Sequence, residues 1–162
     1  MWTKEAILKT GFYNTNINGC EDWEYLIRTF KTDRFQYEYE DDSLMDYIRH
    51  TDSLYVKENE NIIKLKNNIV KIWNFLNNDK ANIVYYSKTN YKILFQRPQQ
   101  IMRFFDKTFN KVFIGNIENV EVDEKYGLLI VPYHIKDCVF NFINNNDKYL
   151  YFTDSRLYNE IT

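Results

Sequence analysis

Two adjacent acids, Glu21 and Asp22, stand directly behind a loop rich in Asn and Gly, at the start of a segment with helical spacing. The exposed amides and the dipole of a helix N-terminus stabilise negative charge at such positions. A carboxylate fixed there stays ionised and well aimed, as a general base toward a hydroxyl nucleophile must be. Acids in a first turn are also common as simple caps of surface helices, and the spacing alone leaves both interpretations open.

The segment that carries these acids is predicted to be an amphipathic helix. Its apolar residues recur at helical spacing and are expected to form the buried face: Trp23, Leu26, Ile27 and Phe30. After this helix, residues 34–40 alternate apolar and polar residues, which predicts a half-exposed strand, and residues 44–49 predict another. The acids between them, Asp41 and Asp42, are either a divalent-ion site or a solvated turn.

The order of these features is specific over roughly the first 55 residues. The motifs are, in order, the Lys4–Tyr13 segment with its Gly11-Phe12 pair, the Glu21-Asp22-Trp23 helix ending near Arg28, and Arg49-His50-x-x-Ser53. This order resembles the C-terminal half of the catalytic domain in family 2 glycosyltransferases, the large inverting GT-A group.

The resemblance assigns roles to individual residues. Asp22 matches the catalytic base that deprotonates the acceptor sugar hydroxyl, and Glu21 matches its acidic partner. Arg28 matches the helix arginine and is assigned, with Trp23, to substrate binding. His50 falls where family members often carry a histidine near the donor diphosphate and the metal.

Other parts of the family pattern are missing from the sequence. Family 2 enzymes bind the nucleotide-sugar through an N-terminal Rossmann-like half and an Asp-x-Asp metal motif, and no Asp-x-Asp triplet occurs here. The nucleotide-sugar donor and its Mn²⁺ or Mg²⁺ ion are therefore expected in an intact parent, and the chain on its own is expected to be inactive. We interpret it as a piece of a longer glycosyltransferase or the product of a split or truncated gene.

Composition sets outer limits on function. The 162 residues include 44% hydrophobic residues, enough for a core, and the net charge of −2 offers no footprint for nucleic acid. Cys20 and Cys138 are far apart and lack metal-ligand spacing, which fits a reducing cytoplasm. No apolar run approaches the length of a transmembrane helix, so contact with the inner face of a membrane is expected only through a partner.

Residues 57–79 predict a long amphipathic helix, which we interpret as a connector between residues 1–56 and residues 80–162. A core helix of a single domain is the alternative. Beyond it, short apolar runs alternate with helical patterns, which implies a parallel sheet with right-handed crossovers. The expected strands are 83–86, 112–115, 120–122, 128–132 and 149–152, and the expected helices start at Pro98, Asp137 and residue 155. The buried stripe of the first of these helices is predicted to comprise Ile101, Met102, Phe104 and Phe105.

The start of the helix at Pro98 carries a second, shorter resemblance. Phe95-Gln96-Arg97-Pro98-Gln99-Gln100, followed by an apolar helix and a strand, resembles the first βα unit of GT-B glycosyltransferases in families 1 and 4. By that resemblance Arg97 faces a cleft and contacts an acceptor anion or a phosphate; a salt bridge or a cap on the sheet is the alternative. His134 follows a strand end, where α/β sheets place ligand-facing residues; a structural or solvent-facing histidine is the alternative.

The predicted fold is therefore α/β: a GT-A-type C-terminal segment joined by a long helix to a small Rossmann-like unit. The leading hypothesis is a glycosyltransferase segment that transfers a sugar, with inversion, to a glycan or glycoprotein acceptor. The alternative is a non-catalytic acceptor-binding or interaction module that works with a complementary glycosyltransferase chain. A third interpretation is one α/β domain in which the motif matches are coincidental.

Overall fold

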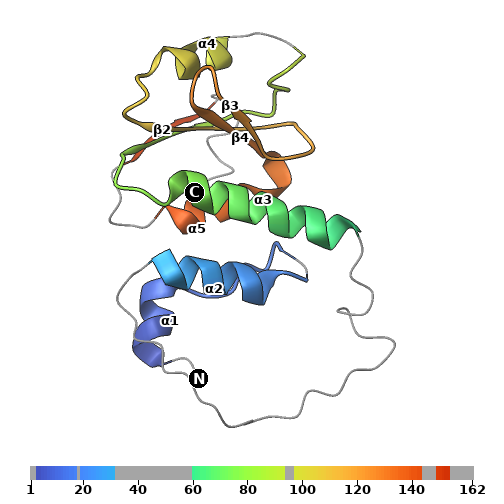
Figure 1. Cartoon of the computed structure of the whole chain (residues 1–162), viewed down its shortest axis with the longest axis vertical. Helices are drawn as coiled ribbons and strands as arrows, with labels where there is room; N and C mark the ends of the chain where they lie inside the picture. The colour runs from blue at the N-terminus through green and yellow to red at the C-terminus, as the bar shows by residue number, and fades with distance from the viewer. Residues whose placement is uncertain (1–2, 18, 32–59, 94–96, 144–148, 154–162) are drawn as a thin grey trace. The chain divides into compact units, whose positions relative to one another are not determined.

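The structure, a computed structural model, describes residues 3–17, 19–31, 60–93, 97–143 and 149–153 (Figure 1). The chain divides into two compact units, an N-terminal unit over Met1–Asn67 and a C-terminal unit over Asn68–Thr162. The helix α3 (Glu60–Leu76) contributes residues to both units. Several predicted features lie outside the described residues: the strands at 34–40 and 44–49, the turn at 41–43, His50 and the helix from residue 155.

The N-terminal unit begins with two helices, α1 (Lys4–Thr10) and α2 (Glu21–Lys31). Thr3 caps α1, because its Oγ1 accepts a hydrogen bond from the Ala6 amide at 3.2 Å. Gly11 ends α1 with a φ of 83°, and its amide donates to the Ile7 carbonyl at 2.8 Å. Glycine adopts this left-handed conformation without the steric cost that a side chain would add.

The buried face of α2 differs from the predicted one. Leu26 is 41% exposed and Phe30 is 44% exposed, so the prediction that they face the core is wrong. The residues that α2 buries are Glu24, Tyr25, Arg28 and Thr29. The Tyr25 ring stacks on Tyr13 with centroids 4.7 Å apart, which directs this side of α2 inward.

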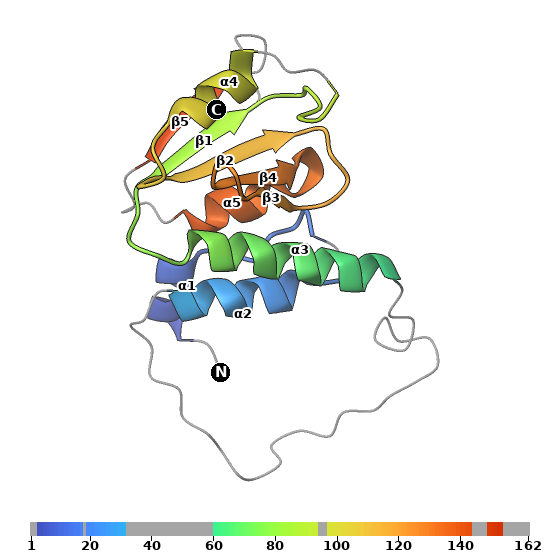
Figure 2. The ribbon, with the colours of Figure 1, turned by 45° about the horizontal axis from the view of Figure 1, so that its top comes forward.

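The C-terminal unit contains a five-stranded sheet in the order β3-β4-β2-β1-β5 (Figure 2). Its strands are β1 (Asn82–Tyr86), β2 (Asn110–Gly115), β3 (Glu121–Asp123), β4 (Leu128–Pro132) and β5 (Tyr149–Thr153). The strands β1, β2, β4 and β5 pair in parallel, and the short edge strand β3 pairs antiparallel to β4. The α/β class and the mostly parallel sheet are as predicted.

Two helices of this unit cover opposite faces of the sheet (Figure 2). The helix α4 (Arg97–Phe104) connects β1 to β2, and α5 (Lys136–Phe142) connects β4 to β5 after a 3₁₀ turn, η1 (Tyr133–Ile135). The main apolar cluster joins Met102 of α4 to side chains of β1, β2 and β4. Every residue of β1, β2 and β4 is buried, as expected for parallel strands covered on both faces.

The apolar stripe of α4 also differs from the predicted one. Phe104 is 94% exposed, whereas Pro98, Gln99 and Met102 are buried. Two residues along a helix correspond to roughly 200° of rotation, so Phe104 points away from the side on which Met102 packs. Ile101 and Phe105 are partly buried against the core, as predicted.

The C-terminal half of α3 anchors the segment that leads into β3. Asn68 is buried, and its Oδ1 accepts a hydrogen bond from the Val120 amide at 3.1 Å. Lys71 donates to the Val120 carbonyl at 3.4 Å. Across the described parts of the chain, no helix has the length and apolar character needed to cross a membrane.

Candidate functional site

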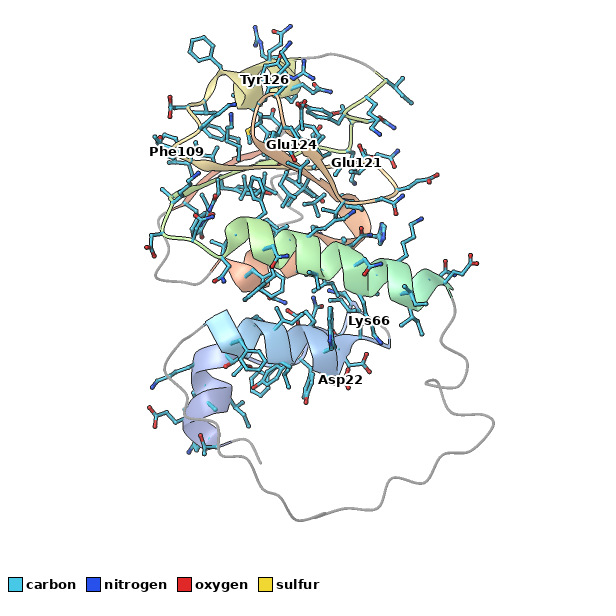
Figure 3. The ribbon with its side chains drawn as sticks, in the orientation of Figure 1. Asp22, Lys66, Phe109, Glu121, Glu124 and Tyr126 are labelled. Atoms are coloured by element: carbon cyan, nitrogen blue, oxygen red, sulfur yellow. The ribbon has the colours of Figure 1, made fainter. Side chains whose placement is uncertain are left out.

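Asp22 lies in the first turn of α2 and is exposed (Figure 3). The helix starts directly before it, since the Glu24 amide donates to the Cys20 carbonyl at 2.9 Å. One carboxylate oxygen of Asp22, Oδ1, accepts a hydrogen bond from the Trp23 amide at 2.7 Å. The carboxylate is thus held at the helix start and is accessible to a hydroxyl group in solution.

Glu21, the neighbouring acid, has a different environment. Its side chain is partly buried, and its Oε2 is shielded from solvent without a hydrogen-bond partner among the described residues. Trp23 is also partly buried. Of the two acids, Asp22 is therefore the more exposed to solvent.

Arg28 lies one turn beyond Glu24 on the buried side of α2. Its Nε donates to Glu24 Oε1 at 3.0 Å, and its Nη2 donates to Glu24 Oε2 at 3.2 Å. The guanidinium also donates to the carbonyls of Thr10 and Phe12, the latter at 2.8 Å. These contacts give Arg28 a structural role at the C-terminal end of α1, which is separate from the substrate-binding role predicted for it.

The C-terminal unit offers a second location for ligands, at the carboxyl edge of its sheet. In the sheet, β2 pairs with one side of β1, and β5, the last strand, pairs with the other side of β1. Such a reversal is a topological switch point, and open α/β sheets bind ligands outside the strand ends there. The described residues at this edge include the loops after β1 and β2 and the turn after β4.

The loop after β1 is fixed by a short hydrogen-bonded turn. The Ser87 amide donates to the Ile114 carbonyl at 2.9 Å, and the Ser87 hydroxyl lies 2.8 Å from the Thr89 hydroxyl. The Asn116 amide donates to the Thr89 carbonyl at 3.0 Å. A Cβ on Gly115 would lie 2.8 Å from that carbonyl oxygen, so the loop approaches β2 too closely for any side chain there.

A polar cluster holds the far end of the same loop. The Tyr91 hydroxyl donates to Asp123 Oδ2 at 3.0 Å and accepts from Arg103 Nε at 3.0 Å. The Arg103 guanidinium lies over the ring of Tyr126, 4.5 Å from the ring centroid (Figure 3). The same guanidinium lies 3.6 Å from the Asp123 carboxylate. Burial raises the pKa of the Tyr91 hydroxyl, so it remains a donor over the physiological pH range.

Arg97 is the first residue of α4 and is exposed. Pro98 occupies the first turn, as predicted. Gln99 is fully buried, and its Nε2 lies 3.5 Å from the Asn90 carbonyl, at the long limit for a hydrogen bond. The Arg-Pro-Gln sequence therefore places an exposed cation two residues before a buried amide that faces the loop after β1.

The remaining predicted residues are not gathered at either location. His134 lies in η1 and is exposed. Within the described ranges, no three side chains from His, Cys, Asp and Glu form a group that could hold a metal ion.

Comparisons of the chain with protein-family models, with curated proteins and with solved structures find no match.

Proposed function

We propose that this chain is a glycosyltransferase segment that takes part in inverting transfer of a sugar from a nucleotide-sugar to a glycan or glycoprotein acceptor. The proposal starts from the resemblance of residues 1–55 to family 2 glycosyltransferases and of residues 80–162 to GT-B enzymes. One observation carries it furthest: the Asp22 carboxylate is exposed in the first turn of α2 while Oδ1 accepts from the Trp23 amide at 2.7 Å.

The proposed step follows from this position. The acceptor hydroxyl oxygen attacks the anomeric carbon and forms the new glycosidic bond, and Asp22 takes the hydroxyl proton. The bond between the anomeric carbon and the diphosphate oxygen breaks, and its electron pair leaves with the nucleoside diphosphate. Attack from the face opposite the leaving group inverts the configuration. Proton transfer requires the base to come within about 3 Å of the attacking oxygen.

A non-catalytic acceptor-binding module is the second candidate. The fixed turn over Ser87–Thr89 and the exposed Arg97 favour it, because a preformed polar edge can bind a ligand without a reacting group. In that case the donor would come from a complementary chain.

Calorimetric titration distinguishes the two candidates. The full chain is titrated with UDP- and GDP-sugars in the presence of Mn²⁺, and separately with oligosaccharide acceptors. Saturable donor binding supports a self-sufficient transferase. Acceptor binding without donor binding supports the module, and binding of neither ligand contradicts the module. A transferase segment that lacks the donor half is expected to bind no donor on its own, so its test is sugar transfer by the intact protein.

A further inference from the structure

The strand β5 forms one edge of the sheet in the C-terminal unit. It pairs with β1 on one side, and among the described strands none pairs with its other side. Tyr149 is 53% exposed and Leu150 is 55% exposed, so the strand is open to solvent where it begins. The edge of a sheet presents amide and carbonyl groups that can bond to a further strand.

The sequence of β5 lacks the features that protect sheet edges from such pairing. Short strands, charged side chains and prolines discourage it. The opposite edge of the sheet has two of these features, because β3 is three residues long and carries Glu121 and Asp123. The stretch from Tyr149 to Phe152 has no charged residue and no proline, and its aromatic residues favour extended pairing.

An apolar groove on α4 is joined to β5 by a pair of rings. The groove is lined by Gln100, Ile101, Phe104 and Phe105. Its Phe105 ring lies 5.9 Å from the Phe152 ring of β5, and α4 and β5 lie next to each other in Figure 2. Phe104 is 94% exposed. The edge of β5 and the groove are therefore neighbouring parts of one exposed apolar surface, and such surfaces are typical of contacts between protein chains.

The sequence around β5 is complementary to itself in antiparallel pairing centred on Tyr151. In that register Leu150 of each copy lies opposite Phe152 of the other, so apolar side chains meet across the new strand pair. Lys148 and Asp154 flank β5 in the sequence, outside the described residues, and stand at equal distances from Tyr151. The register therefore sets a lysine opposite an aspartate at both ends, and opposite charges in such positions stabilise a strand pair.

We propose that the edge of β5 binds the same edge of a second copy of this chain, with the two β5 strands antiparallel across a twofold axis. The two sheets then continue into one another, and the same surface serves both copies, so assembly stops at the dimer. The proposal does not depend on the transfer reaction. Dimer formation is measured without any sugar, so its failure and the failure of the transferase proposal can be told apart.

The test is sedimentation of the full chain over a series of concentrations, with charge reversals at the two flanking positions. Lys148→Glu and Asp154→Lys each replace two attractive contacts by two repulsive ones, so each should raise the dimer dissociation constant about tenfold or more. An equimolar mixture of these two variants should form mixed dimers, because every glutamate or aspartate then faces a lysine. The double variant Lys148→Glu/Asp154→Lys should dimerise as the wild type does.

The matched controls make the same charge changes at the turn between β3 and β4. Lys125→Glu and Glu124→Lys alter exposed residues there, and each should leave the dissociation constant within about twofold of the wild-type value. Amide hydrogen exchange supplies an independent measurement. Exchange over Tyr149–Phe152 should slow as the protein concentration is raised, because new hydrogen bonds form along this edge.

Three results would overturn the inference. They are a chain that stays monomeric up to about 1 mM, growth into assemblies larger than the dimer, and a dimer that neither single charge reversal weakens. If a single variant fails to fold, as judged by far-UV circular dichroism, the double variant and the hydrogen exchange of the wild type decide the question. Unchanged exchange over β5 in a wild-type dimer would place the contact on another surface.

Discussion

Glu24 and Arg28 form a doubly hydrogen-bonded ion pair on the buried side of α2, with distances of 3.0 Å and 3.2 Å. Glu24 is fully buried, and Arg28 is 6% exposed. The same guanidinium binds the carbonyls at the end of α1, so the pair fixes one helix to the other. A Cβ on Gly11 would lie 3.2 Å from Arg28 Nη1, which shows how closely the guanidinium approaches the end of α1.

Replacing Glu24 by Leu should destabilise the chain strongly. The change leaves the Arg28 charge buried without its carboxylate, and such losses cost about 3–5 kcal/mol. Urea unfolding followed by circular dichroism measures the effect. The control is Lys9→Met, which breaks the ion pair with Glu5 at the same helical spacing on an exposed surface and should leave the midpoint nearly unchanged. Equal shifts in the two variants would contradict the structural role assigned to the Glu24–Arg28 pair.

Gly115→Ala should also destabilise the C-terminal unit. The added methyl group would lie 2.8 Å from the Thr89 carbonyl oxygen and 2.6 Å from Phe113 Cε1, so the loop after β1 must shift. Overpacking of this kind costs about 1–3 kcal/mol. Thermal unfolding should show the loss, with Asn116→Ala as the control, because that side chain is exposed. A Gly115 variant as stable as the Asn116 variant would show that the loop is looser than described.

Two phenylalanines of the C-terminal unit should respond in opposite ways to truncation. Phe113 is fully buried in the apolar cluster, and Phe113→Ala should cost about 3–5 kcal/mol in the free energy of unfolding. Phe104 is 94% exposed, and Phe104→Ala should change that free energy by less than about 0.5 kcal/mol. Denaturant titrations of the two variants check the orientation of α4. A large loss in the Phe104 variant would show that the predicted stripe was right and the described one wrong.

Lys111 should make stability depend on pH in the alkaline range. It is 1% exposed, its Nζ donates to the Phe105 carbonyl at 2.9 Å, and burial lowers its pKa below the usual 10.5. Between the folded pKa and 10.5 the unfolded chain binds more protons than the folded chain, so the free energy of unfolding rises with pH there.

The comparison with Lys111→Met isolates this contribution from those of the tyrosines. The difference in unfolding free energy, wild type minus variant, should increase as the pH rises toward 10.5. Tyr151 acts in the opposite direction at higher pH, because burial raises its pKa to about 12 and the folded chain keeps that proton above pH 10. A wild type and a variant with parallel pH profiles would refute the assignment to Lys111.

The sheet was predictable from the sequence because its strands are short apolar runs. Buried parallel strands carry apolar residues on both faces, so residues 83–86, 112–115 and 128–132 stand out without any alternation. The start of α4 was predictable from Pro98, because proline is favoured in the first turn of a helix. Features that depend on one or a few adjacent residues were therefore recovered.

The buried face of α2 was not predictable in the same way. Hydrophobic periodicity places Leu26 and Phe30 on the buried face of α2. The structure instead buries Glu24 and Arg28, because they hydrogen-bond to each other and Arg28 also donates to carbonyls at the end of α1. That compensation requires partners far along the chain, which periodicity does not detect. Lys111 was missed because hydrophobic periodicity does not detect that a buried ammonium group can donate to a backbone carbonyl, here that of Phe105.

The candidate site residues show the same difference between local sequence signals and contacts made only by the fold. Asp22 and Arg97 belong to helix starts and could be singled out from local sequence alone. Tyr91, Arg103 and Asp123 come together only through the fold, and no spacing in the sequence links them. The glycosyltransferase roles of Asp22 and Arg97 stay predictions.

The most direct test of the proposed function is the transfer rate of Asp22→Asn in the intact protein. Asparagine is similar in shape but cannot accept the acceptor proton, so turnover should fall about 10²–10⁴-fold while donor affinity is retained. Glu124→Gln, an equal loss of charge at an exposed acid labelled in Figure 3, should keep wild-type turnover. Near-normal transfer by the Asp22 variant would contradict the assignment of Asp22 as the base.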